Sequence, residues 1–240
     1  MPDKIEQNMI LPFNDEEEKL YVANLAKVNE ELQQLYDIEG SDKMQILKML
    51  TRLRQLCLEP RLVYDNIDRP SSKLKACMEL IKTMQENKQK VLLFSSFTSV
   101  LDLIAEECQK AGITYYMLTG STNKEDRREL VSRFQKDGTT VFLISLKAGG
   151  TGLNLTSAEA VIHFDPWWNV SAQNQATDRA YRIGQKNNVQ VFNLVMKDSV
   201  EEKIIELQKR KKELADMFVE NNSGGLSQMS KEDILSLFTM

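Results

Sequence analysis

The residues after Ser71 alternate between two kinds of pattern. Short apolar runs rich in β-branched residues are separated by longer segments with helical periodicity. The runs expected to form strands are Val91–Ser95, Ile113–Leu118, Thr140–Ser145, Ala160–Phe164 and Val189–Val195. The segments expected to form helices are Ser72–Glu86, Ser99–Ala111, Lys124–Lys136 and Ala172–Arg182. This alternation predicts an α/β fold in which a parallel sheet is covered by helices on both faces.

The segments on both sides of this region show helical periodicity. In residues 15–37 an apolar stripe recurs at helical spacing, and Asn14 stands as an N-cap with Glu17 at the capping-box position. The residues after Asp198 are helical again. We therefore expect three parts, which are a helical extension over residues 1–70, an α/β domain over residues 71–196 and a C-terminal helical brace over residues 197–240.

Charge is distributed unevenly along the 240 residues. The net charge of −4 argues against a nucleic-acid partner at first sight, but residues 1–40 account for −7 and the remainder carries +3. A local basic groove is therefore compatible with the composition. No apolar run reaches the length of a membrane helix, and the polar N-terminus has no secretory signal. We expect no membrane partner and an intracellular location, in the cytoplasm or nucleoid of a bacterium or the nucleus of a eukaryote.

One tract combines glutamine and arginine at helical spacing. Within residues 175–185 (QATDRAYRIGQ), Gln175, Arg179 and Arg182 stand at positions i, i+4 and i+7, which lie on one stripe of a helix. Two arginines on one face suit an anion, and a triphosphate in its transition state is the most demanding one. The sequence contains no Gly-x-x-x-x-Gly-Lys-[Ser/Thr] loop to cradle phosphate. The tract thus indicates half of a nucleotide site, and a salt-bridged surface helix is the alternative.

Other candidate binding residues follow the expected strands, at the edge where parallel sheets bind ligands. The glycines of Leu146–Leu155 would let backbone amides approach phosphate, although an ordinary tight turn is the alternative. The small hydroxylated segment Thr119–Ser121 suits phosphate oxygens, with plain turn chemistry as the alternative. Trp167 and Trp168 are either packing anchors or ligand contacts. His163, within a strand, is expected to be structural.

Four tracts together carry a resemblance to a known family. They are Lys90–Thr98 (KVLLFSSFT), Met117–Ser121 (MLTGS), Val141–Leu155 (VFLISLKAGGTGLNL) and Val161–Gln185 (VIHFDPWWNVSAQNQATDRAYRIGQ). In this order, and with compatible spacing, they resemble the second-lobe motifs of SWI/SNF-type ATPases, the double-stranded DNA translocases of helicase superfamily two. The motif-bearing part runs from about Ser71 to Val195, and the flanks look like that family's helical extensions.

The resemblance implies a DNA-dependent ATP hydrolase in which ATP with Mg²⁺ binds between two RecA-like lobes. The first lobe would supply the P-loop lysine, the Mg²⁺-binding carboxylates and the water-positioning acid. This chain would supply arginine fingers and half of the DNA track, so the isolated fragment is predicted to be inactive. The implied partners are double-stranded DNA, the first lobe of the same parent chain and a DNA-bound protein target.

The resemblance also assigns roles to single residues. Arg179 and Arg182 would be the catalytic arginine fingers. The nucleotide contacts would come from Gln175, Gly150, Gly152 and Asn154. The DNA contacts would come from Ser96, Thr98, Thr119, Gly120, Ser121, Lys147 and Thr151. No metal ligand is assigned to this lobe.

Three positions depart from the family's usual pattern. Val170 stands where proline is common, Gln173 where glutamate is common and Tyr181 where histidine is often found. None of them removes an expected phosphate ligand. Two other functions stay open, a non-catalytic DNA-binding or interaction module and a lobe of an RNA helicase. The intact arginine stripe argues against the first, and the Asp165–Asn169 tract (DPWWN) argues against the second.

Overall fold

The computed structural model describes residues 2–36, 43–149, 153–217 and 237–238. The chain divides into two compact units, and both are built from segments that are distant in sequence. The first, which we call the sheet unit, comprises Met1–Met9 and Leu74–Val195; the second, the helical unit, comprises Ile10–Lys73 and Met196–Met240.

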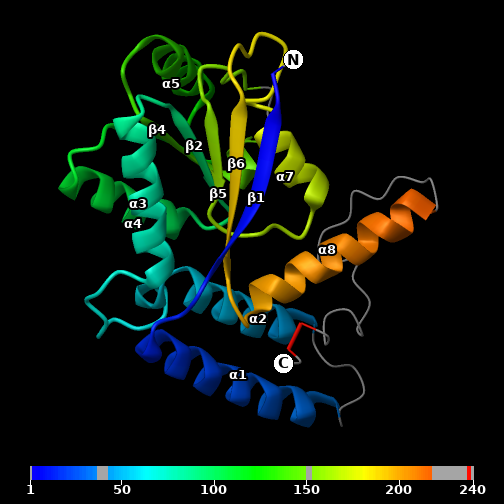
Figure 1. The fold of residues 1–240 in the computed structure, drawn as a ribbon. Helices are drawn as coiled ribbons and strands as arrows, with labels where there is room; N and C mark the ends of the chain where they lie inside the picture. Colours follow the sequence, from blue (N-terminus) through cyan, green and yellow to red (C-terminus); the bar gives the residue numbers. More distant parts are fainter. Residues whose placement is uncertain (1, 37–42, 150–152, 218–236, 239–240) are drawn as a thin grey trace. The chain divides into compact units, whose positions relative to one another are not determined.

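The sheet unit contains a parallel sheet with the strand order β1-β6-β5-β2-β4-β3 (Figure 1). The strands are β1 (Lys4–Leu11), β2 (Val91–Ser95), β3 (Tyr115–Leu118), β4 (Val141–Ser145), β5 (Ala160–His163) and β6 (Val189–Met196). The intervening helices are α3 (Ser72–Glu86), α4 (Thr98–Lys110), α5 (Lys124–Lys136), α6 (Leu146–Gly149) and α7 (Val170–Thr177). The predicted RecA-like α/β fold with a parallel sheet is confirmed.

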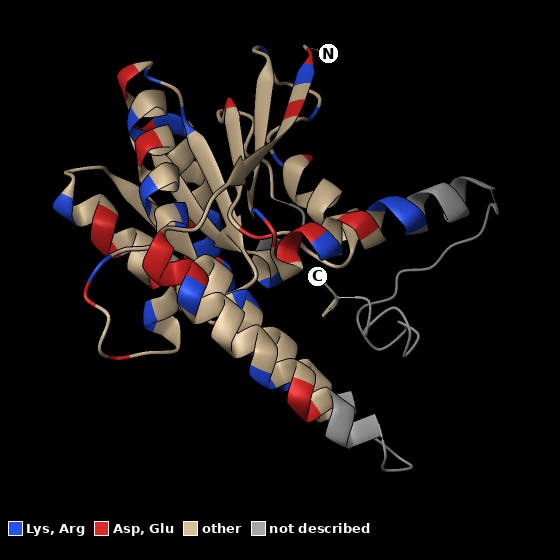
Figure 2. Cartoon of the chain, turned by 60° about the horizontal axis from the view of Figure 1, so that its bottom comes forward, with Lys and Arg blue, Asp and Glu red and all other residues tan. Residues whose placement is uncertain are grey.

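The central strands explain why this sheet is covered by helices. Every residue of β2 (VLLFS) and β4 (VFLIS) is buried, and the first four residues of each strand are all apolar instead of alternating. Such a pattern is typical of parallel strands that pack on both faces. On one face the ring of Phe134 from α5 packs 5.2 Å from the ring of Phe142, between centroids. Figure 2 shows the consequence, since charged residues lie mostly on the helices and the strands are largely uncharged.

Strand β1 was not predicted from the sequence. Most of its residues are exposed, and it carries charged residues, as Figure 2 shows near the N mark. It lies beside β6, where the Val189 amide donates to the Asp3 carbonyl at 3.0 Å and the Asp3 amide donates to Asn188 Oδ1 at 2.9 Å. Exposed, charged residues are typical of an edge strand. Its partner is 185 positions away in sequence, so no local pattern announces the pairing.

The helical unit contains α1 (Asp15–Tyr36), α2 (Lys43–Leu58), the short helix η1 (Pro60–Leu62) and α8 (Val200–Met217). The predicted capping box is confirmed, because the Glu17 amide donates to Asn14 Oδ1 at 3.0 Å and the Asn14 amide donates to Glu17 Oε2 at 3.1 Å. The apolar stripe of α1 is buried at Tyr21, Leu25, Val28 and Leu32. Burying each such side chain stabilises the fold by about 1.5–3 kcal/mol. Among the described residues, no helix is long and apolar enough to cross a membrane.

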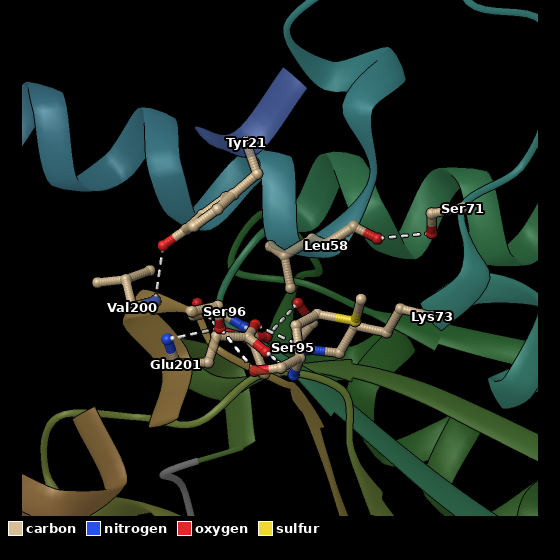
Figure 3. Close-up of polar contacts among 11 residues, drawn as sticks. Tyr21, Leu58, Ser71, Lys73, Ser95, Ser96, Val200 and Glu201 are labelled. Carbon is tan, nitrogen blue, oxygen red and sulfur yellow. Dashed lines mark hydrogen bonds and ion pairs between the residues drawn. The ribbon is translucent and has the colours of Figure 1, made fainter. Parts of the chain in front are cut away.

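A buried polar cluster lies inside the helical unit (Figure 3). Lys73 Nζ donates to both carboxylate oxygens of Glu201 at 2.7 Å, and neither side chain is exposed. The Val200 amide donates to the Tyr21 hydroxyl at 2.7 Å, and the Ser71 hydroxyl donates to the Leu58 carbonyl at 2.8 Å. These contacts connect residues that precede β2 in the sequence to residues that follow β6.

Candidate functional site

The described residues that were predicted to contact DNA gather at one edge of the sheet. Because the strands are parallel, the residues that follow β2, β3, β4 and β5 all leave the sheet at its carboxyl edge. Of the predicted phosphate-contacting side chains, Thr98, Ser121 and Lys147 are exposed. Gly150, Thr151 and Gly152 lie outside the described residues.

The arginine tract lines an open hollow of about 430 Å³. Its lining residues are Gln175, Asp178, Arg179, Tyr181, Arg182 and Ile183. The three side chains that the sequence grouped, Gln175, Arg179 and Arg182, therefore do share one surface. The hollow is large enough for a small ligand, and its donors suit an anion.

The secondary structure of this tract was predicted wrongly in part. The expected helix Ala172–Arg182 ends at Thr177, so Gln175 stands on α7 while both arginines stand on the turns that follow. After Thr177 the backbone turns tighten, since the Arg179 amide donates to the Ala176 carbonyl, three residues back, at 3.2 Å. The Arg179 carbonyl accepts from the Leu155 amide at 3.0 Å, a tertiary contact that replaces a helical one.

Gln185 holds these turns against the preceding loop, a role that the sequence analysis missed. Its buried Nε2 donates to the Ala158 carbonyl at 2.8 Å and to the Ala180 carbonyl at 3.1 Å. Its Oε1 accepts from the amides of Lys186 and Asn187 at 2.9 and 3.0 Å. A side chain with both donors and acceptors is needed to satisfy these groups together. The signal in the sequence was a glutamine directly after the glycine of the Arg-Ile-Gly turn.

The electrostatics of the hollow favour a bound anion. Partial burial, and then the charge of Arg182, lower the pKa of Arg179, while Asp178 opposes the shift. A guanidinium stays protonated at neutral pH, so the two arginines keep two like charges close together. Negative charge placed between them would relieve that repulsion and supply acceptors for their fork-shaped donors.

Asp165 organises the loop that follows β2. This carboxylate is almost fully buried, and it accepts from the Ser95 hydroxyl at 2.7 Å, the Ser96 amide at 3.0 Å and the Ser96 hydroxyl. Figure 3 shows Ser95 and Ser96 side by side. In this arrangement the Ser96 hydroxyl donates its proton inward, to the buried carboxylate of Asp165. Thr98, by contrast, begins α4 and is exposed.

The other two loops are also supported by hydrogen bonds. The Thr119 hydroxyl lies 2.8 Å from the Ser121 hydroxyl, and the Thr119 amide donates to Thr122 Oγ1 at 3.1 Å. Beside Lys147, the Ala148 carbonyl accepts from Arg127 Nη1 at 3.1 Å. Asn154 is exposed. These contacts fix the backbone and leave the Lys147 side chain in solvent.

His163 lies beneath α7 and has no exposed edge. Its Nε2 lies 2.9 Å from Thr177 Oγ1, its ring stacks on Phe94 at 5.7 Å between centroids, and its Nδ1 has no hydrogen-bond partner among the described residues. Burial lowers the pKa of His163 to about 4, with Asp165 opposing the shift. A neutral, enclosed imidazole supports the last turn of α7 and does not reach a ligand.

Comparisons with known proteins give the family. Residues 72–184 match the helicase conserved C-terminal domain. The chain is 36% identical over 239 residues, 99% of its length, to an uncharacterized ATP-dependent helicase of Mycoplasma pneumoniae, of which it covers 23%. It is also 33% identical over 254 residues, 98% of its length, to the ISWI chromatin-remodeling complex ATPase ISW1 of Saccharomyces cerevisiae, of which it covers 22%. Its homologues are thus SWI/SNF and ISWI ATPases. It spans about a quarter of the length of the curated relatives it matches.

Solved structures place this SWI/SNF-type chain at the second lobe. The C-terminal part of the Fun30 ATPase domain superposes with a TM-score of 0.80 at 25% identity, covering 99% of this chain and 96% of that one. The Sulfolobus solfataricus SWI2/SNF2 ATPase core in complex with double-stranded DNA superposes with a TM-score of 0.78 at 31% identity, covering 98% of this chain and 50% of that one. The match to nearly all of the C-terminal part of one ATPase domain, and to only half of a complete core, identifies the SWI/SNF-type lobe as the C-terminal, RecA-like one.

Proposed function

We propose that this lobe works in a SWI/SNF-type, ATP-dependent translocase that moves along double-stranded DNA. The observation that carries the proposal is the hollow in which Gln175, Arg179 and Arg182 converge. Two sets of relatives support it. A Mycoplasma pneumoniae relative is described as an ATP-dependent helicase, and a Sulfolobus solfataricus relative is described in complex with double-stranded DNA.

The arginines would act on ATP bound between this lobe and the first lobe of the same parent chain. Negative charge spreads over the transferring phosphoryl oxygens as the bond to ADP breaks. A guanidinium already in place stabilises that charge more than it stabilises bound ATP, which lowers the barrier. Gln175, on α7 next to them, would hydrogen-bond near the γ-phosphate. Mg²⁺, held by the first lobe, would neutralise phosphate charge when bound.

The DNA track would run over the loops at the carboxyl edge. Exposed Lys147, with Thr98 and Ser121, offers a charge and two hydroxyls, which suit phosphate oxygens and read no base sequence. Opening and closing of the lobes with each ATP would step the protein along the duplex, within the bacterial cytoplasm or the eukaryotic nucleus. A DNA-bound protein would be the displaced target.

The decisive experiment replaces either arginine by lysine in the full-length protein. Lysine keeps the charge and lacks the planar two-pronged donor, so Arg179→Lys and Arg182→Lys should each slow DNA-stimulated ATP cleavage by about 10³–10⁵-fold in single-turnover assays. Arg133→Lys is the matched control, because Arg133 is 56% exposed on α5 and does not line the hollow. A lysine there keeps the charge beside Glu129, at 3.6 Å, and over the Tyr116 ring. Near-parental cleavage in both test variants would reduce these arginines to surface residues and overturn the proposal.

Stimulation of ATP hydrolysis in the full-length protein distinguishes a DNA translocase from an RNA helicase and from a binding module. A DNA translocase should be stimulated by duplex DNA and little by RNA, whereas an RNA helicase should show the reverse. A binding module would bind DNA with the same affinity in all three variants and hydrolyse no ATP above background.

A further inference from the structure

The side chain of Gln173 connects the tryptophan loop to the sheet. It stands in the first turn of α7, where its Oε1 accepts from the Trp167 amide at 3.2 Å. Its Nε2 donates to Asn193 Oδ1 on β6 at 3.1 Å. One side chain thus contacts the loop Asp165–Asn169 and the strand next to the edge strand of the sheet.

Asn193 extends this connection to the edge strand. It is 7% exposed, and its Nδ2 donates to Glu6 Oε1 at 3.0 Å and to Asn8 Oδ1 at 2.9 Å, both on β1. Each oxygen and each nitrogen of the two amides therefore makes at least one hydrogen bond. Burying such groups is costly unless they are paired, so the arrangement restrains all three elements to one another.

The direction of the hydrogen bonds explains why this pair uses amides. Position 173 must accept from a backbone amide and also donate to Asn193, and an amide does both. A glutamate would keep the acceptor for Trp167 but lose the donor. Position 193 must accept from α7 and donate to a carboxylate on β1, which an aspartate would instead repel.

We infer that Gln173 and Asn193 are positioning residues. They hold the loop Asp165–Asn169 and the start of α7 in place relative to the edge strand β1. Neither touches the hollow. Through α7 they hold Gln175 and the turns that carry the arginines, a consequence for ATP cleavage that rests on the proposed function. The geometric claim does not depend on that function and can be tested on this 240-residue chain by itself.

The chain offers a selective probe, because its two tryptophans are both in this loop. Labelling with ¹⁵N-tryptophan gives two backbone amide signals, and ¹³C-labelled proline carbonyl assigns Trp167, which follows Pro166. Gln173→Met removes the acceptor with little change in volume, so hydrogen exchange of the Trp167 amide should become about tenfold faster, as expected for a single hydrogen bond. Gln173→Glu keeps the acceptor for the Trp167 amide but loses the donor for Asn193, so the Trp167 amide should lose less protection than in the Met variant. Equal protection in the parent and the Met variant, or equal loss in both variants, would overturn the inference.

A second pair of variants tests the link to β1. Asn193→Asp places a carboxylate against Glu6 and should disturb the Trp167 and indole signals, while Glu6→Gln added to it restores a donor and should return them toward the parental positions. Glu6→Gln alone, at an exposed edge position, is the control. If a single variant at position 173 or 193 fails to fold, the double variant Asn193→Asp, Glu6→Gln still tests the inference. Recovery in the double variant supports the relay, and no recovery overturns it. Neither readout involves ATP or DNA, so failure here leaves the proposed function standing.

Discussion

The ammonium of Lys73 lies 2.7 Å from both carboxylate oxygens of Glu201, and both side chains are fully buried in the helical unit. Glu201 Oε2 also accepts from the Met196 amide at 2.8 Å. Burial, and then the charge of Glu201, raise the pKa of the neighbouring Cys57 thiol. The desolvation cost of a buried ion pair offsets much of its attraction. The net contribution of the pair to stability is therefore smaller than the loss of stability on removing one partner alone.

We predict that removing one partner is more harmful than removing both. Lys73→Met leaves a buried carboxylate without its cation and should lower the free energy of unfolding by about 3–5 kcal/mol. Adding Glu201→Gln removes the orphaned charge and keeps an acceptor for the Met196 amide, so most of that loss should be recovered. Urea unfolding of the parent, both single variants and the double variant measures this. Additive losses in the double variant would contradict the prediction.

His163 should make the stability of the sheet unit sensitive to acid. Its pKa of about 4 in the folded chain lies below the ordinary value near 6.5. As the pH falls the unfolded chain therefore binds the proton first. The stabilisation is present above about pH 6.5 and is lost as the pH falls toward about 4, a change of roughly 3 kcal/mol. His163→Gln keeps a donor for Thr177 without titrating, so its stability should fall less between about pH 7 and about pH 4.5. Parallel losses in parent and variant would exclude His163 as the cause.

Lys147 should contribute charge and no sequence preference to DNA binding. In the full-length protein, Lys147→Ala should weaken binding to two unrelated duplexes alike and make the salt dependence shallower by about one counterion. Lys82→Ala on α3 is the matched control, because Lys82 is exposed and lies near the end of a helix that leads to the amino edge of β2. Titrations at several salt concentrations measure the slopes. An unchanged slope, or weakening confined to one duplex, would argue against a phosphate contact.

The isolated 240-residue chain should fold and bind phosphate weakly but hydrolyse ATP no faster than background. Its sequence has no P-loop lysine motif, and arginines alone do not position the attacking water. Phosphate release with and without duplex DNA checks this, and circular dichroism confirms that the sample is folded. A robust DNA-stimulated rate from this chain alone would refute the idea of a shared site.

Much of the fold could be predicted because it depends on local patterns. The continuous apolar runs of β2 and β4 and the helical periods of α3 and α5 appear in the structure within a residue of their predicted bounds. The capping box of Asn14 and Glu17 formed as expected, since both groups lie within one turn. The described residues predicted to contact DNA follow β2, β3 and β4, so they lie at the carboxyl edge, because parallel strands bring successive loops to one side.

What the sequence by itself determined was therefore most of the internal strands and helices, the order of the motifs and the identity of the arginine tract. Only the tertiary structure decided where that tract stops being helical and what holds it. The Leu155 amide and the Gln185 side chain bind the carbonyls of Arg179 and Ala180, which a longer helix would have used internally. Likewise, β1 exists as a strand because β6 supplies its partners, and Gln173 and Asn193 meet only because the sheet places them together. These groups are distant in sequence, so no local periodicity encodes their contact.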